Sequence, residues 1–230
     1  MTKIAVNNCA SIAIIFPQND PHQMFIQQKD TGLPNRFGQD EALCPFGGNW
    51  LGEEAMDDSG PFRTLVRELD EEWCATDGQG GFTRPAALQG IFEVVSKVAR
   101  PYRAALVETA SEVWSTATKT RAGFVTRVSY FQAALEDDDW AVLVLLQDLY
   151  GRLSNEGNSR VTSLDEVLRL GLRGAYGHDQ ALQQFWRDHG YNEAADMFVY
   201  PNPKALDIPW LDSYEDILAA YDIAKTPLAA

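Results

Sequence analysis

The sequence predicts an α/β fold of the mixed α+β type, and two observations support this. Short apolar runs bounded by turn residues, at 10–16 and 24–29, are typical of strands, whereas longer segments with apolar residues every three or four positions are typical of helices. The 230-residue chain is 45% hydrophobic and contains six Trp, eight Tyr and eleven Phe, which argues for a full core and against disorder. We therefore expect residues 1–230 to form a single domain.

The first elements are expected to be strands. Residues 10–16 are rich in Ile and precede a Pro-containing turn at 17–21, as in a buried central strand. Residues 24–29 form a second such run, so the two are expected to pair as a hairpin. A third strand is expected to lead into the glycine turn at the end of residues 43–48, LCPFGG.

The most informative stretch is the acidic segment RELDEE at residues 67–72. Glu68, Glu71 and Glu72 stand at positions i, i+3 and i+4, so on a helix they fall within about 60° of one another around the axis. Like charges this close repel unless something neutralises them, and hard cations such as Mg²⁺ take oxygen ligands. A divalent-metal site is one interpretation. A solvated acidic helix face, in a chain of formal charge −14, is the other.

The flanking residues favour a helix from about residue 61 to residue 73. Pro61 suits the first turn of a helix, where its missing N–H costs nothing, and Ser59 or Asp58 is a candidate cap. We expect the face opposite the carboxylates to pack on the core through Val66, Leu69 and Trp73.

Together with Gly48 and Glu54 upstream, this segment resembles the box of the Nudix hydrolase superfamily, G-x5-E-x7-R-E-U-x-E-E-x-G-U, in which U is aliphatic. The Gly48 to Glu54 spacing matches, and so does the last half of the box from Arg67 onward. There are two departures. Twelve residues rather than seven separate Glu54 from Arg67, and Cys74 and Ala75 replace the glycine and the aliphatic residue. The resemblance extends over residues 10–74.

The resemblance implies a mixed sheet sandwiched between helices and a metal-dependent chemistry. The implied reaction is hydrolysis of a diphosphate linkage in a nucleoside diphosphate joined to another moiety, with Mg²⁺ or Mn²⁺ as the cofactor. The implied metal ligands are the carboxylates of Glu68, Glu71, Glu72 and Glu54 and the carbonyl of Gly48.

The same resemblance implies three catalytic residues, Arg67, Glu71 and Glu156. Arg67 would pair with a box glutamate and fix its rotamer, while Glu71 or Glu156 would accept a proton. Glu156 lies just before residues 161–166, VTSLDE, which resemble the segment that precedes the last helix in the family. The alternative is an ordinary turn at Glu156, followed by a capping box formed by Ser163 and Glu166.

Two other functions remain open for the chain as a whole. A Nudix-fold module that binds or senses a nucleotide without hydrolysing it would accommodate the lengthened box. An isomerase on the same fold would need a proton donor such as Cys44.

The middle of the chain predicts two further helices, at residues 86–99 and 102–120, separated by Arg100-Pro101. Together they would form a helical insertion over residues 80–121. This insertion would cover the substrate cleft, form a homodimer interface or simply complete the core.

The rest of the chain alternates between strand and helix patterns. We expect a strand at 123–135 and helices at 140–153, 180–187 and 214–224, with residues 192–230 forming a C-terminal extension. Asp137, Asp138 and Asp139 would favour a helix N-terminus. His178 would cap or pack the helix that follows it, or else orient a phosphate.

Charge and cysteine content limit the partners and the compartment. The formal charge of −14 disfavours binding to nucleic acids or anionic membranes, so we expect a small-molecule partner. The three cysteines, at 9, 44 and 74, form no CxxC pair and suggest neither a disulfide framework nor a zinc site, as expected for the cytoplasm. We also expect no membrane span, since no apolar run reaches about 18 residues.

Overall fold

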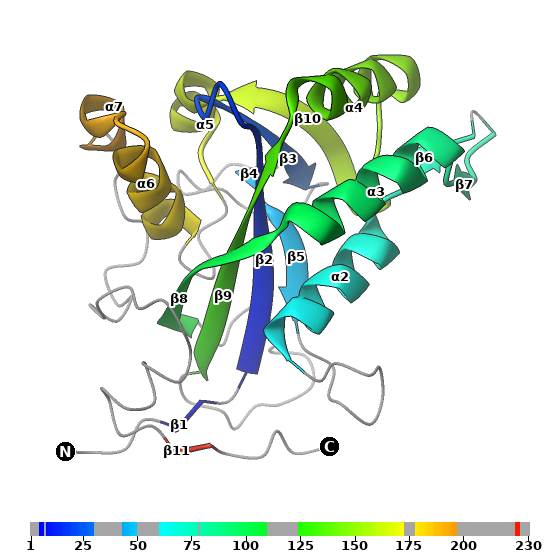
Figure 1. The fold of residues 1–230 in the computed structure, drawn as a ribbon. Helices are drawn as coiled ribbons and strands as arrows, with labels where there is room; N and C mark the ends of the chain where they lie inside the picture. The colour runs from blue at the N-terminus through cyan, green and yellow to red at the C-terminus, as the bar shows by residue number, and fades with distance from the viewer. Residues whose placement is uncertain are drawn as a thin grey trace.

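The computed structural model describes residues 5–6, 8–29, 43–49, 60–77, 79–109, 124–172, 178–196 and 224–225. Within these residues the chain forms a seven-stranded mixed sheet with helices on both faces, as the sequence predicts (Figure 1). A two-residue strand, β1, also pairs in parallel with β11 near the other end of the chain. The bounds of these two strands are Ala5–Val6 for β1 and Ala224–Lys225 for β11.

The main sheet has the strand order β10-β3-β2-β9-β8. β2 runs parallel to β9 and antiparallel to β3, while β8 is antiparallel to β9 and β10 is antiparallel to β3. The expected hairpin of the first two strands is therefore confirmed. The bounds are β2 Asn8–Pro17, β3 Gln23–Lys29, β8 Arg100–Thr109, β9 Phe124–Leu135 and β10 Gly157–Ser163.

Two short strands place the glycine turn against the centre of this sheet. β4, Leu43–Cys44, pairs with β3, and β5, Phe46–Asn49, pairs with β2. Gly47 has a φ of 128°, and a Cβ on it would lie 2.1 Å from the carbonyl oxygen of Ser11, so the register requires glycine here.

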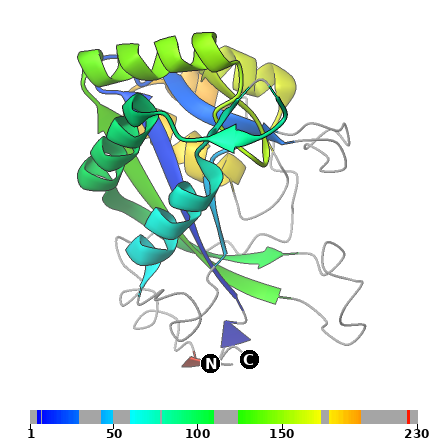
Figure 2. The same ribbon diagram turned by 90° about the vertical axis from the view of Figure 1, so that its right-hand side faces the viewer.

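The helices form two layers with separate hydrophobic clusters (Figures 1 and 2). One face is covered by α2, Pro61–Glu72, α3, Ala86–Val98, and α4, Asp137–Tyr150. The other face is covered by α5, Leu164–Leu170, α6, His178–Asp188, and α7, Asn192–Asp196. Alternate side chains of β2 enter the two clusters, with Ile14 in one and Ile15 in the other, so this strand is buried on both faces.

The expected helix at residues 102–120 is wrong over its described part. Residues 102–109 belong to strand β8, which pairs with β9 from Arg100↔Gln132 to Thr109↔Phe124. The remainder of that expected helix, from 110 onward, lies outside the described residues. Apolar spacing favoured a helix, but the long antiparallel partner supplies the backbone hydrogen bonds, and tertiary pairing overrides local preference.

Other expectations are confirmed with small shifts in their limits. α2 begins with Pro61 in its first turn, but its N-cap is Gly60, with no side-chain cap bond, rather than Ser59 or Asp58. Ser163 caps α5 by accepting from the backbone N–H of Glu166 over 3.3 Å, which confirms the Ser163 half of the expected capping box. The Glu166 carboxylate accepts from Thr162 and Arg160. The remaining short strands form a hairpin, β6 at Ala75–Thr76 and β7 at Phe82–Thr83. The expected helix at 214–224 lies outside the described residues, apart from residue 224 in β11.

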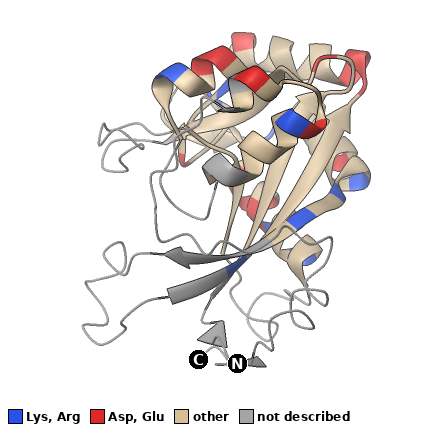
Figure 3. Cartoon of the chain, turned by 90° about the vertical axis from the view of Figure 1, so that its left-hand side faces the viewer, with Lys and Arg blue, Asp and Glu red and all other residues tan. Residues whose placement is uncertain are grey.

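Along the described backbone, Lys and Arg positions are interspersed with Asp and Glu positions in the view of Figure 3. Among the described helices, none is both long and apolar enough to cross a membrane.

Candidate active site

The acidic segment lies in α2, which packs against β2 and β5 on one face of the sheet. Leu65 and Leu69 are buried in the core cluster of this face, and Trp73 follows directly after the helix. The helix therefore holds its apolar side against the sheet, as expected. The glutamate side chains of α2 lie in different environments, because Glu72 is buried whereas 46% of the Glu71 side chain is exposed.

Arg67 connects two of the glutamates to the glycine turn. Its guanidinium lies 2.7 Å from Glu68 Oε1 and 2.9 Å from Glu71 Oε2, and it donates to the carbonyl oxygen of Asn49 over 2.6 Å. Arg67 thus holds the rotamers of Glu68 and Glu71 and ties α2 to the end of β5. This contact agrees with the positioning role that the sequence suggested for Arg67.

Glu68 lies directly against Gly48. A Cβ on Gly48 would stand 2.1 Å from Glu68 Oε2 and 2.5 Å from its carboxyl carbon, so a larger residue would collide with this carboxylate. The structure thus brings Gly48 and the box helix together. That the Gly48 carbonyl binds a metal stays a prediction.

Glu72 accepts hydrogen bonds inside the protein. Its Oε2 accepts from Gln27 Nε2 over 2.9 Å and from the backbone N–H of Gly47 over 3.2 Å, and only 2% of the residue is exposed. This carboxylate joins α2 to β3 and to the glycine turn. Charge-assisted hydrogen bonds of this kind compensate for part of the cost of burying it.

Glu156 comes to the same cluster from a segment that is distant in sequence. It lies in the loop between α4 and β10, and its charge acts on Glu68. Burial raises the pKa of Glu68, Arg67 lowers it, and the nearby charges of Glu71 and Glu156 raise it further, leaving a net rise. The charges of Glu71 and Glu156 thus both act on Glu68, beside the guanidinium of Arg67.

The donor set fits a hard divalent cation in kind. The side chains converging here offer carboxylate oxygens, and Gln27 Oε1 is a buried acceptor without a hydrogen-bond partner among the described residues. Mg²⁺ and Mn²⁺ bind such oxygens. In the described part of the chain, no three His, Cys, Asp or Glu side chains are already arranged around one point.

Not every predicted site residue can be placed. Glu54 lies outside the described residues, so its role as a metal ligand stays a prediction. Cys44, the proton donor of the isomerase alternative, is buried, and its Sγ lies 3.5 Å from His178 Nε2. His178 is also buried, with Nδ1 3.2 Å from the Tyr130 hydroxyl, which agrees with a packing role.

The sequence analysis did not predict Gln27, which contacts Glu72 in the site. Gln27 and Phe25 lie two positions apart in β3 and so point to the same buried face. A glutamine on such a face needs a buried polar partner, and that signal was present. Nothing in the sequence indicates that this partner would be Glu72.

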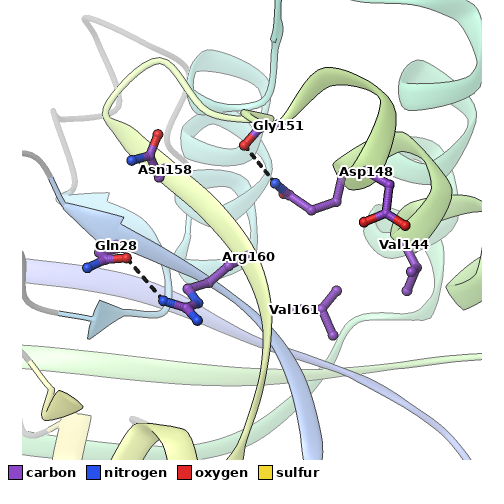
Figure 4. Close-up of a pocket in the computed structure, with 8 residues that line it drawn as sticks. Gln28, Val144, Asp148, Gly151, Asn158, Arg160 and Val161 are labelled. Carbon is purple, nitrogen blue, oxygen red and sulfur yellow. Dashed lines mark hydrogen bonds between the residues drawn. The ribbon is translucent and has the colours of Figure 1, made fainter.

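A separate cavity of about 440 Å³ opens between α4 and β10 (Figure 4). Arg160 donates to Gln28 Oε1 over 3.2 Å at one side of it, and Gln147 donates to the carbonyl oxygen of Gly151 over 2.8 Å. None of the glutamates of the candidate site lines this cavity.

The raised pKa of Glu68 predicts a pH dependence of stability in metal-free protein. A raised folded-state pKa means that the native state binds more protons than the unfolded state, so this group lowers the free energy of unfolding as the pH rises from its ordinary value of 4.5 through the raised one. Glu68→Gln is expected to remove this decline and to be the more stable protein at neutral pH. Urea unfolding between pH 4 and 8 with a chelator measures the free energy of unfolding of the wild type and of Glu68→Gln. If this free energy declined equally in both proteins, the decline would not come from Glu68.

Comparison with known proteins gives similarity at the level of solved structures. No protein-family model matches the sequence, and no curated protein sequence matches it. NrtR from Shewanella oneidensis is 15% identical, with a TM-score of 0.45 over 79% of this chain and 62% of that one, so the present chain spans less than two thirds of the NrtR chain. The dihydroneopterin triphosphate pyrophosphohydrolase of E. coli is 14% identical, with a TM-score of 0.44 over 80% of this chain and 99% of that one.

A third solved structure is a Nudix hydrolase of M. smegmatis, RenU, which is 14% identical, with a TM-score of 0.43 over 80% of this chain and 88% of that one. A Nudix hydrolase is thus among the solved structures to which this chain is similar.

Proposed function

We propose that this protein is a divalent-metal-dependent hydrolase that cleaves a diphosphate linkage in a nucleoside diphosphate joined to another moiety. The observation that carries the proposal is that Arg67 holds Glu68 and Glu71 of α2 together, while the charge of Glu156, from the loop before β10, acts on Glu68. Carboxylates this close can share a bound cation, whereas without a cation they repel one another. Oxygen ligands of this kind commonly connect Mg²⁺ to substrate phosphates.

Different residues of the chain have different roles in the proposed reaction. Glu68, Glu71 and Glu72 would hold Mg²⁺ or Mn²⁺, and Arg67 would keep Glu68 and Glu71 in place. The chemistry supplied by the bound cation is polarisation of the phosphoryl oxygens and activation of water. Water then adds to one phosphorus atom, the bridging P–O bond breaks, and the carboxylate of Glu71 or Glu156 accepts the proton.

One observation favours the alternative of a binding module without hydrolysis. Arg67 already pairs with both Glu68 and Glu71, and Glu72 is occupied by Gln27 and Gly47. Such a network is able to hold the helix in place without any cation. The two functions differ in whether a bound nucleotide is turned over.

A panel assay with Glu71→Gln distinguishes the two functions. Wild-type protein with Mg²⁺ or Mn²⁺ is incubated with ADP-ribose, dinucleoside polyphosphates and nucleoside triphosphates, and the products are separated by chromatography. We expect at least one compound to be hydrolysed, and Glu71→Gln to lower the rate at least about 100-fold through loss of a charged ligand.

Glu193→Gln is the matched control, because Glu193 is an exposed glutamate on α7 that packs on the opposite face of the sheet. It should hydrolyse at the wild-type rate. If wild-type protein hydrolyses none of these compounds, yet a nucleotide raises its unfolding temperature, the hydrolase proposal fails and the binding module stands.

A further inference from the structure

The loop at residues 152–156 closes the C-terminal end of α2. The backbone N–H of Asn155 donates to the carbonyl oxygen of Glu72 over 3.1 Å, and Asn155 Nδ2 donates to that of Glu71 over 2.8 Å. The last carbonyls of a helix lack partners within the helix. Asn155 supplies hydrogen-bond donors to two of these carbonyls, from a segment more than 80 residues away in the sequence.

A second tether runs through the core. Gln27 Nε2 donates both to Glu72 Oε2, over 2.9 Å, and to Ser154 Oγ, over 3.1 Å. Ser154 Oγ in turn accepts from the backbone N–H of Glu156 over 3.2 Å. Gln27 and Ser154 are both fully buried, so these bonds are shielded from water. One glutamine thus contacts a box carboxylate and the turn that presents Glu156.

Arg152 fixes the loop from within. Its Nε donates to the carbonyl oxygen of Ser154 over 2.6 Å, and its Nη2 donates to that of Asn155 over 2.9 Å. The backbone on both sides of Asn155 is therefore held. Glu156 itself is exposed and follows directly.

We infer that Asn155 and Gln27 are positioning residues that hold Glu156 against Glu68 and Glu71, and this inference rests on the proposed metal-dependent function. The carboxylate of Glu156 is repelled by those of α2, so an untethered loop would relieve the repulsion by moving away. The tethers oppose that movement and keep a fourth carboxylate at the site. Neither residue touches the substrate in this scheme, because Asn155 acts through Glu156 and Gln27 acts through Glu156 and Glu72.

Titration with Mn²⁺ alone, followed by electron paramagnetic resonance, tests the inference without substrate. Asn155→Ala removes the side-chain donor but keeps the backbone N–H, so the variant should fold. We expect its Mn²⁺ affinity and kcat each to fall about 10- to 100-fold with KM little changed, as for other residues that orient metal ligands. Gln27→Met should likewise lower the Mn²⁺ affinity and kcat.

A double-mutant cycle separates positioning from a purely structural role. In a Glu156→Gln background, Asn155→Ala should lower the Mn²⁺ affinity no further, because its effect passes through Glu156. Asn158→Ala, an exposed asparagine in β10, is the control and should bind Mn²⁺ like wild type. Additive losses in the double variant, or an unchanged affinity in Asn155→Ala, would overturn the inference.

The outcomes also distinguish this inference from the proposed function. Hydrolysis by wild type together with independent effects of Asn155 and Glu156 would refute the positioning role alone. Coupled Mn²⁺ affinities in a protein that hydrolyses no compound would support the positioning role and refute the hydrolase.

Discussion

Gly48→Ala is expected to lower kcat/KM for hydrolysis at least about 100-fold while leaving the fold intact. The added Cβ would lie 2.1 Å from Glu68 Oε2, and the neighbour that must move is the end of a flexible side chain rather than backbone. The Glu68 carboxylate would therefore swing out of place, and misplacement of about 1 Å in an active site costs about 100-fold. Steady-state kinetics on the compound identified by the panel assay measures the loss.

Two other glycines provide the controls for Gly48→Ala. Gly90 lies exposed within α3, with open space around its Cα, so Gly90→Ala should keep full activity and gain about 0.5–1 kcal/mol of stability. Gly47→Ala should instead destabilise the protein, since its Cβ would meet the backbone oxygen of Ser11 at a φ of 128°. Wild-type kinetics in Gly48→Ala would show that Glu68 is not needed where the structure places it.

Trp73→Ala is expected to lower the free energy of unfolding by about 3–5 kcal/mol, as for other large buried aromatic residues. Trp73 is fully buried, and its ring packs edge-to-face against Phe25 at 5.7 Å and Phe46 at 5.5 Å between centroids. The substitution leaves a cavity where α2, β3 and β5 meet. Urea unfolding followed by far-ultraviolet circular dichroism gives the value.

Trp73→Phe is the matched variant for this site. Within the described residues Trp73 Nε1 has no hydrogen-bond partner, so the smaller ring loses volume but no hydrogen bond. Trp73→Phe should lower the free energy of unfolding clearly less than Trp73→Ala does. Equal losses in the two variants would mean that the cost does not come from ring packing.

The helices and strands that the sequence predicted correctly are those whose secondary structure depends on residues close together in the chain. α2 followed from Pro61 at its start and from the spacing of Val66, Leu69 and Trp73, and the α5 cap followed from Ser163 and Glu166. β8 did not follow, because apolar residues three or four positions apart are compatible with both a helix and a strand. The pairing of β8 with β9 decided between them, and that pairing depends on a segment that begins at residue 124.

The candidate site divides in the same way. Arg67, Glu68 and Glu71 were recognised from a single helical turn, and their mutual contacts are those of neighbours on one helix. Glu156 was suggested by a short resemblance in sequence, and its proximity to Glu68 became visible only in the fold.

The acidic helix, its apolar face and the first two strands could be predicted locally, because the helix and strand periods depend on residues a few positions apart. Three contacts could not: the burial of Glu72 against Gln27, the approach of Glu68 to Gly48, and the closure of the end of α2 by Asn155. Each of them joins segments that are distant in the chain. Their energies depend on strand register and helix packing, which no local pattern specifies.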